Sequence, residues 1–153
     1  MADRNRRRFL ALAGLGALGL ATGLTRPARA QASVVHVYAS PYCGCCHQWV
    51  NHMRDAGFEV KVRLTEDLDP VKSYFGVAPA LQSCHTAVVD GYVIEGHVPA
   101  RDVARLLSER PQARGLAVPG MPAGSPGMEQ GGASDPYDVL LFGDKGARVY
   151  ARH

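Results

Sequence analysis

The chain has 153 residues, with 17 lysines and arginines against 14 aspartates and glutamates, and 46% of its residues are hydrophobic. Six basic residues but only one acidic residue fall in the first 30 positions, so the remainder has a net charge of −2 with neutral histidine. This balance leaves no excess of basic residues for nucleic acid, and the length allows one modest hydrophobic core.

The first 30 residues have the pattern of an export signal. Paired arginines precede Phe9-Leu10, an apolar stretch runs from Ala11 to Leu24, and small residues end the segment at Ala30. The arginine pair is typical of the bacterial twin-arginine type. The apolar stretch is short for a membrane span, and an uncleaved N-terminal anchor is the alternative. We predict a cleaved twin-arginine-type signal over residues 1–30 and a periplasmic domain over residues 31–153.

The first elements of that domain follow from hydrophobic periodicity. Val34–Tyr38 is apolar and β-branched, which is typical of a central strand buried on both faces. A turn at Ser40-Pro41 leads into a helix from Cys45 to Ala56, which Gly57 ends. Residues 58–64 alternate strictly between apolar and polar, which predicts a second strand, parallel to the first, with one solvated face.

Two short features come next along the chain. A helix is predicted from Asp69, the candidate cap, to about Phe75, with Pro70 in its first turn. Asp90-Gly91 has apolar residues on both sides and predicts a two-residue hairpin.

The C-terminal third divides into three parts. Pro99 begins a helix with one apolar stripe, and Pro111 ends it. Residues 112–136 are rich in glycine, proline and methionine and predict an irregular loop, which at this length is usually functional or disordered. A final hairpin is predicted around Gly143–Gly146.

Three of the four cysteines lie in the turn between the first strand and the first helix: Cys43, Cys45 and Cys46. Cys84 lies at the start of the hairpin strands. A Cys-x-x-Cys turn in this order of elements is typical of thioredoxin-like proteins. We therefore predict an α/β, thioredoxin-like three-layer fold with a mixed β-sheet. The helix N-terminus favours thiolate over thiol.

The cysteines allow two kinds of chemistry. Cys43 and Cys46 would be the redox pair of a thiol–disulfide oxidoreductase, with Ala78-Pro79 near the usual place of a cis-proline. Cys45 counts against this function because an extra thiol can trap the wrong disulfide. Alternatively, all four sulfurs bind a soft metal. Three sulfurs from one turn and one from elsewhere favour bridging thiolates and more than one Cu(I) ion over a single zinc ion.

Further donors lie elsewhere in the chain. Met121 and Met128 are thioethers in the irregular loop, which would shield or load cuprous ions. His85 and His97 flank the hairpin and are interpreted as ligands or as supports of the ligands. His47 is predicted to be exposed on the first helix. The remaining histidines are a structural one in the first strand and two without an assigned role: His36, His52 and His153.

Four motifs resemble those of the CopG-like periplasmic proteins, a family associated with copper resistance and long described as a domain of unknown function. The motifs are Tyr42–Cys46, Ser83–Thr86, Glu95–Pro99 and Gly115–Pro122, and the match extends from Val34 to Tyr150. The resemblance implies a thioredoxin-like fold and a cysteine-bridged copper cluster with four thiolate ligands: Cys43, Cys45, Cys46 and Cys84.

We therefore predict an exported copper-binding protein of metal homeostasis or resistance, more a metal-binding protein than an enzyme. It would hold Cu(I), and its partners would be copper ions and other periplasmic copper-handling proteins, with no nucleic acid and no membrane after signal cleavage. Thiol–disulfide exchange through Cys43 and Cys46, and redox cycling of bound copper, are the alternatives.

Overall fold

The computed structural model describes residues 33–153 except 130 and 133, and the predicted signal lies outside these residues. The strands are β1 Val34–Ala39, β2 Glu59–Leu64, β3 His85–Val89, β4 Tyr92–Glu95, β5 Gly115–Ala117, β6 Asp138–Gly143 and β7 Gly146–Arg152. The helices are α1 Gly44–Asp55, α2 Asp69–Tyr74 and α3 Ala100–Glu109, with a short 3-10 turn at Pro79–Leu81.

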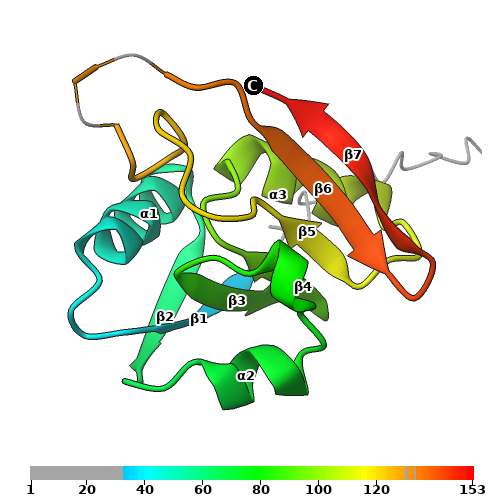
Figure 1. Cartoon of the computed structure of the whole chain (residues 1–153), viewed down its shortest axis with the longest axis horizontal. Coiled ribbons are helices and arrows are strands. Elements are labelled where there is room, and N and C mark those ends of the chain that lie inside the picture. The colour runs from blue at the N-terminus through cyan, green and yellow to red at the C-terminus, as the bar shows by residue number, and fades with distance from the viewer. Residues whose placement is uncertain (1–32, 130, 133) are drawn as a thin grey trace, which may run out of the picture. The chain divides into compact units, whose positions relative to one another are not determined.

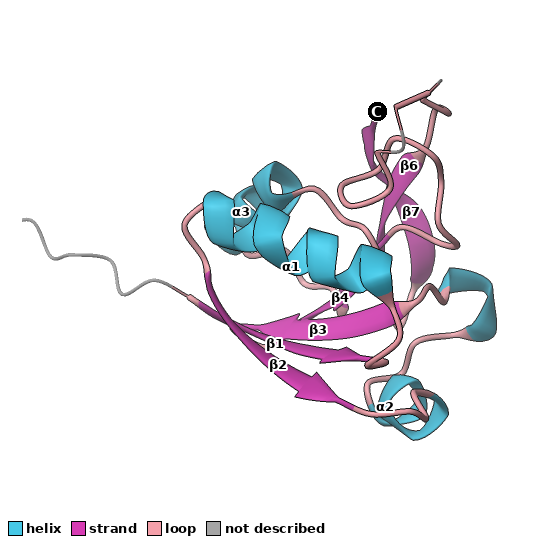
Figure 2. Cartoon of the chain, turned by 90° about the vertical axis from the view of Figure 1, so that its left-hand side faces the viewer, coloured by secondary structure: helices cyan, strands magenta, loops and turns pink. Residues whose placement is uncertain are grey.

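All the described strands join one mixed sheet in the order β2-β1-β3-β4-β5-β6-β7. β1 is parallel to β2 and antiparallel to β3, and β3 forms the predicted hairpin with β4. Helices α1 and α3 lie on one face of the sheet and α2 on the other (Figure 2). This arrangement confirms the predicted α/β, thioredoxin-like three-layer fold. β5 runs parallel to β4, and the hairpin of β6 and β7 extends the sheet beyond it (Figure 1).

The core lies between the sheet and the pair α1 and α3. Val35, Val37 and Ala39 of β1 are completely buried there. His36, between them, is exposed. The prediction that this strand is buried on both faces is therefore wrong, because the six-residue α2 leaves part of the opposite face uncovered. β2 is an edge strand on which only Val60 is even half-buried, so its predicted apolar face is largely solvated.

Helix α1 packs on the sheet through large apolar side chains. Trp49, Val50 and Met53 are buried, and the Trp49 indole Nε1–H donates to the carbonyl of Val98 at 2.8 Å. Gly57 follows the helix with φ of +93°, the left-handed conformation that glycine adopts without strain. Among the described residues, no helix has the length and apolar character needed to cross a membrane.

Two predicted details are wrong. Asp69 is the first residue of α2 and not its cap, because Leu68 precedes the helix and the carboxylate of Asp67 accepts the N–H of Asp69 at 3.0 Å. The predicted irregular loop contains β5. A Cβ atom on Gly115 would lie 1.7 Å from the carbonyl oxygen of Val93, so glycine is what allows β5 to approach β4.

Two histidines that were assigned no role connect parts of the fold. His153 Nε2 lies 2.7 Å from the Asp102 carboxylate, and its ring stacks on Tyr137. His52 joins α1 to α3, because its Nε2 accepts the backbone N–H of Ala100 at 3.0 Å. Partial burial lowers the pKa of His52, despite the opposing effects of nearby carboxylates. The hydrogen bond requires the neutral ring.

This environment predicts an acid-sensitive junction between α1 and α3. Because the folded pKa of His52 lies below the unfolded value of about 6.5, its contribution to stability is complete above that pH and is lost as the pH falls through the folded pKa. We expect the urea midpoint of His52→Gln to fall less steeply than that of the wild type between about pH 7.5 and 5.5. The exposed His36→Gln control should keep the wild-type slope. Identical slopes for His52→Gln and the wild type would contradict the assignment.

Candidate metal centre

The four cysteines converge because the register of the sheet places the start of β3 beside the end of β1. Ala39, the last residue of β1, pairs with His85, the first residue of β3. Cys84 therefore lies next to the turn that follows β1. That turn carries the other three cysteines at the start of α1, with Cys43 as the residue before the helix and the others in its first turn.

The spacing of the four sulfur atoms suits a metal site. All four lie within 4.8 Å of one another. The Cys45 Sγ is 3.5 Å from that of Cys43 and 3.8 Å from that of Cys84, and Cys46 and Cys84 are 3.5 Å apart. An ion bound tetrahedrally by thiolates at about 2.3 Å would hold its sulfurs about 3.8 Å apart. The structure thus brings together the sulfurs singled out from the sequence, and their role as ligands stays a prediction.

Two of the four cysteines are joined. Cys43 and Cys46 form a disulfide, and Cys45 and Cys84 are free thiols. The joined pair is the one considered for thiol–disulfide exchange. All four sulfurs can act as thiolates only after this bond has been reduced.

Two buried histidines surround Cys84. Its Sγ is 3.0 Å from Nε2 of His97 and 3.5 Å from Nδ1 of His85, and both rings are completely buried. The other ring nitrogen of His97, Nδ1, lies 2.8 Å from the carbonyl oxygen of Pro126. Because that carbonyl can only accept, Nδ1 carries the proton and Nε2 presents its lone pair to Cys84. Both histidines therefore lie where they can bind a metal or position a ligand.

The surroundings of Cys84 disfavour charge in the metal-free protein. Burial, together with the neighbouring Cys45, raises the pKa of the Cys84 thiol to about 12. Burial lowers the pKa of His85 well below its usual value, with smaller contributions from His97 and Lys72, and burial also lowers the pKa of His97. The group is therefore a neutral thiol between two neutral imidazoles. A metal that binds here must displace the thiol proton.

The loop between β5 and β6 covers the cysteine turn. Gly127, with φ of +88°, lies so close to α1 that a Cβ atom would be 2.8 Å from the carbonyl oxygen of Cys45 and from the N atom of Trp49. On the other side of the site, the Ser83 hydroxyl donates to the carbonyl of Gly120. Figure 1 shows this yellow and orange segment beside α1. The loop is thus attached to both segments that carry the cysteines.

The methionines of this loop differ in exposure. Met121 is 52% exposed, and Met128 is half-buried. Met121 directly follows Gly120, so its backbone lies beside the Cys84 segment while its side chain reaches solvent. A direct role of Met121 in metal binding stays a prediction.

A buried ion pair behind Cys84 was not predicted. Lys72 Nζ lies 2.5 Å from Glu95 Oε1, and their side chains are only 5% and 0% exposed. Glu95 Oε1 also accepts the N–H of Ser83 at 2.7 Å, and Oε2 accepts the Thr86 hydroxyl at 2.6 Å. The carboxylate therefore holds the chain on both sides of Cys84. The available sequence signal was a glutamate at the end of an otherwise apolar strand.

Other residues considered from the sequence do not belong to this cluster. His47 is exposed on α1, as predicted. Pro79 is exposed, and none of the peptide bonds among residues 33–153, apart from the two positions not described, is cis. The expected cis-proline beside the cysteines is therefore wrong for the described residues.

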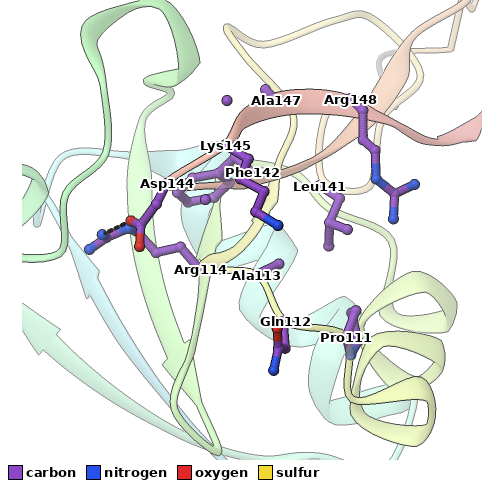
Figure 3. Close-up of a pocket in the computed structure, with 12 residues that line it drawn as sticks. Pro111, Gln112, Ala113, Arg114, Leu141, Phe142, Asp144, Lys145, Ala147 and Arg148 are labelled. Carbon is purple, nitrogen blue, oxygen red and sulfur yellow. Dashed lines mark hydrogen bonds and ion pairs between the residues drawn. The ribbon is translucent and has the colours of Figure 1, made fainter.

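A groove of about 620 Å³ lies between the end of α3 and the turn from β6 to β7 (Figure 3). Its lining includes Arg114 and Asp144, which form an ion pair at 2.8 Å. The lining contains neither cysteine nor histidine, so the groove is separate from the metal-donor cluster.

These features define a class of protein, the thioredoxin-like domains in which cysteines from two separated segments meet. Residues 81–128, which include Cys84 and both histidines, match the family described as "Protein of unknown function, DUF411". Two solved structures of the copper resistance protein copG, forms 1 and 2, are each 44% identical to this chain. They cover 80% of it and 98–99% of their own chains, with TM-scores of 0.76 and 0.77. The chain therefore belongs to the copG family, as the motifs indicated. No curated protein matches the sequence.

The ion pair behind Cys84 generates a stability prediction. Lys72→Met removes one charge and leaves the Glu95 carboxylate buried without its cation, which should cost about 3–5 kcal/mol in the free energy of unfolding. The matched control is Lys61→Met, which breaks an exposed pair with Glu59 and should change stability by less than about 1 kcal/mol. Urea unfolding measures both. Equal destabilisation by the two substitutions would show that the buried pair does not support the fold.

Proposed function

We propose that this protein binds cuprous ions and takes part in copper homeostasis or resistance. Similarity to the copper resistance protein copG supports a copper-related role. The main structural support is that the sulfur atoms of the four cysteines all lie within 4.8 Å of one another. Soft thiolate donors suit Cu(I), zinc and iron–sulfur clusters, whereas carboxylates and carbonyls suit harder ions, and the similarity to copG favours copper among the three.

The proposed ligands are four thiolates: Cys43, Cys45, Cys46 and Cys84. They become available after an external thiol reductant transfers two electrons to the Cys43–Cys46 disulfide. Three of the sulfurs come from one turn and the fourth lies opposite. This crowded arrangement suits thiolates that each bridge two ions better than it suits four thiolates around a single ion. We therefore propose more than one Cu(I) per chain, with copper as cargo and not as a catalytic cofactor. The secondary candidates for ligands are Met121, His85 and His97.

We propose that the protein works in the periplasm. Residues 1–30 would act as a twin-arginine-type signal cleaved near Ala30, and residues 31–153 would form the mature metal-binding domain. Its partners would be copper ions and other copper-handling proteins of the same compartment, with no nucleic acid and no membrane after cleavage. The net charge of −2 after residue 30 supports the absence of a nucleic-acid partner.

The disulfide favours a second candidate function, thiol–disulfide exchange. Cys43 is partly accessible at the start of α1 and Cys46 is completely buried, so an external thiolate would attack Cys43 and release the Cys46 thiolate. The thiols of Cys45 and Cys84 count against it, because each lies within 3.5 Å of one sulfur of the pair and can divert the exchange. Redox cycling of bound copper would combine the two functions.

A single substitution separates copper binding from exchange. Cys45→Ser removes one proposed thiolate and leaves the Cys43–Cys46 pair intact. We expect the reduced variant to bind no more than one Cu(I) per chain, with an affinity lower by more than about tenfold, since loss of a group that merely supports a ligand already costs about 10–100-fold. Anaerobic titration against a chromogenic Cu(I) chelator measures both quantities.

The control is His47→Ala, which changes an exposed residue of the same helix and should leave copper loading unchanged. Insulin reduction is measured on the same proteins without metal. Wild-type copper loading by Cys45→Ser would refute the four-thiolate site. Rapid insulin reduction that survives Cys45→Ser, together with no Cu(I) bound by the reduced wild type, would establish the exchange function instead.

A further inference from the structure

Beside the four sulfurs, the structure holds a second group of metal donors. Sγ of Cys84 and one ring nitrogen from each of His85 and His97 all lie within 4.8 Å of one another. Both imidazoles are completely buried. Buried imidazole nitrogens need partners, because water cannot solvate them there. The partners of the two rings therefore indicate what the group is built to hold.

His97 is oriented as a metal-binding histidine is. Its Nδ1–H donates to the buried carbonyl of Pro126 at 2.8 Å. This bond fixes the tautomer and the ring plane, and it leaves the Nε2 lone pair 3.0 Å from the sulfur of Cys84. A histidine whose second nitrogen donates to a backbone carbonyl is the usual arrangement around protein-bound metals.

His85 has a single weak hydrogen-bonding contact in the metal-free protein. Its Nε2 is buried without a hydrogen bond to any described residue, and its Nδ1 has the sulfur of Cys84 at 3.5 Å. Its ring packs between the rings of Trp49 and His97. A completely buried imidazole with one weak sulfur contact is costly for folding alone. A metal bound at Nδ1 would replace this weak sulfur contact with a strong bond, while Nε2 would carry the ring proton and still lack a hydrogen bond to the described residues.

The distances fit a single ion. A metal about 2.3 Å from sulfur and about 2.0–2.1 Å from nitrogen, with tetrahedral angles, holds sulfur and nitrogen about 3.5 Å apart. The separation from Cys84 to His85 has this value, and the separation from Cys84 to His97 is 3.0 Å. An ion therefore enters the group if the Cys84–His97 pair opens by about 0.5 Å.

We propose that Cys84, His85 and His97 form a second metal-binding set, for a borderline divalent ion, which stays complete while Cys43 and Cys46 are joined. One thiolate and two imidazoles suit Zn(II) or Cu(II) better than Cu(I). Three protein ligands leave a fourth position for water or an exchanging group. Binding exchanges the Cys84 thiol proton for the metal and involves no electron transfer.

The second set does not depend on the proposed Cu(I) site, although the two share Cys84. The all-sulfur set needs the reduced cysteines, whereas the mixed set needs neither Cys43 nor Cys46. When the disulfide opens, the thiolates of Cys43 and Cys46 join that of Cys45 and compete for a soft ion. The redox state of one disulfide would thus decide whether the protein offers a mixed site or an all-sulfur site.

Cobalt(II) tests the mixed site because it does not oxidise thiols and reports its ligands optically. The full chain is prepared with Cys43–Cys46 closed, confirmed by two remaining free thiols, and titrated anaerobically with Co²⁺. We expect one Co²⁺ per chain, with a sulfur-to-cobalt charge-transfer band and the intense visible bands of a four-coordinate ion, both removed by added Zn²⁺. Cys84→Ser, which is nearly isosteric, should abolish the charge-transfer band.

The second variant is His97→Ala, which should weaken Co²⁺ binding by more than about tenfold. His47→Ala is the control for loss of an imidazole, and its Co²⁺ affinity should equal that of the wild type. Cys45→Ser should also leave Co²⁺ binding unchanged while it lowers Cu(I) loading. The mixed site and the all-sulfur site are therefore tested independently of each other. Absence of the bands in the oxidised wild type would overturn the proposal. So would Co²⁺ binding that requires Cys45 and not His97.

Discussion

The antiparallel pairing of β1 with β3 brings the two cysteine-bearing segments of the chain together. Because Ala39 lies opposite His85, the residue before β3 is held beside the turn after β1. Cys84 therefore meets three cysteines that precede it by about forty positions. A shift of the register by one residue would turn Cys84 to the other face of the sheet and dissolve the cluster. The backbone ladder thus sets where Cys84 meets the other three donor atoms.

Several costly features surround this pairing and support the same few atoms. The Lys72–Glu95 pair is buried, and its carboxylate binds the chain on both sides of Cys84. Two imidazoles are buried against the sulfur. Such polar groups rarely stabilise a core better than apolar ones of similar size would. Their concentration around Cys84, the residue that the two proposed metal sites share, indicates that this part of the fold gives up stability for binding chemistry.

Local signals predicted most of the fold, and tertiary contacts explain what they did not predict. Asp90-Gly91 specified the hairpin because both residues adopt left-handed backbone conformations, as such a turn requires. The Cys-x-x-Cys turn and the order of elements predicted which sulfurs would meet. β5 could not be predicted from hydrophobic periodicity because it has only three residues. It forms because Gly115 allows close contact with Val93 of β4. The burial of Lys72 and the exposure of His36 could not be predicted from the sequence either. Each depends on how much of the sheet face the short helix α2 covers. The disulfide joins Cys43 and Cys46, the pair that the Cys-x-x-Cys spacing singled out.

X-ray absorption at the copper edge shows directly which atoms bind the metal. The protein is reduced, loaded with Cu(I) without oxygen and freed of excess metal. We expect sulfur as the principal neighbour of copper, together with a second copper at the short distance that a shared thiolate imposes. Copper surrounded by nitrogen and oxygen, with no sulfur neighbour, would contradict the claim that the four cysteines form the binding site.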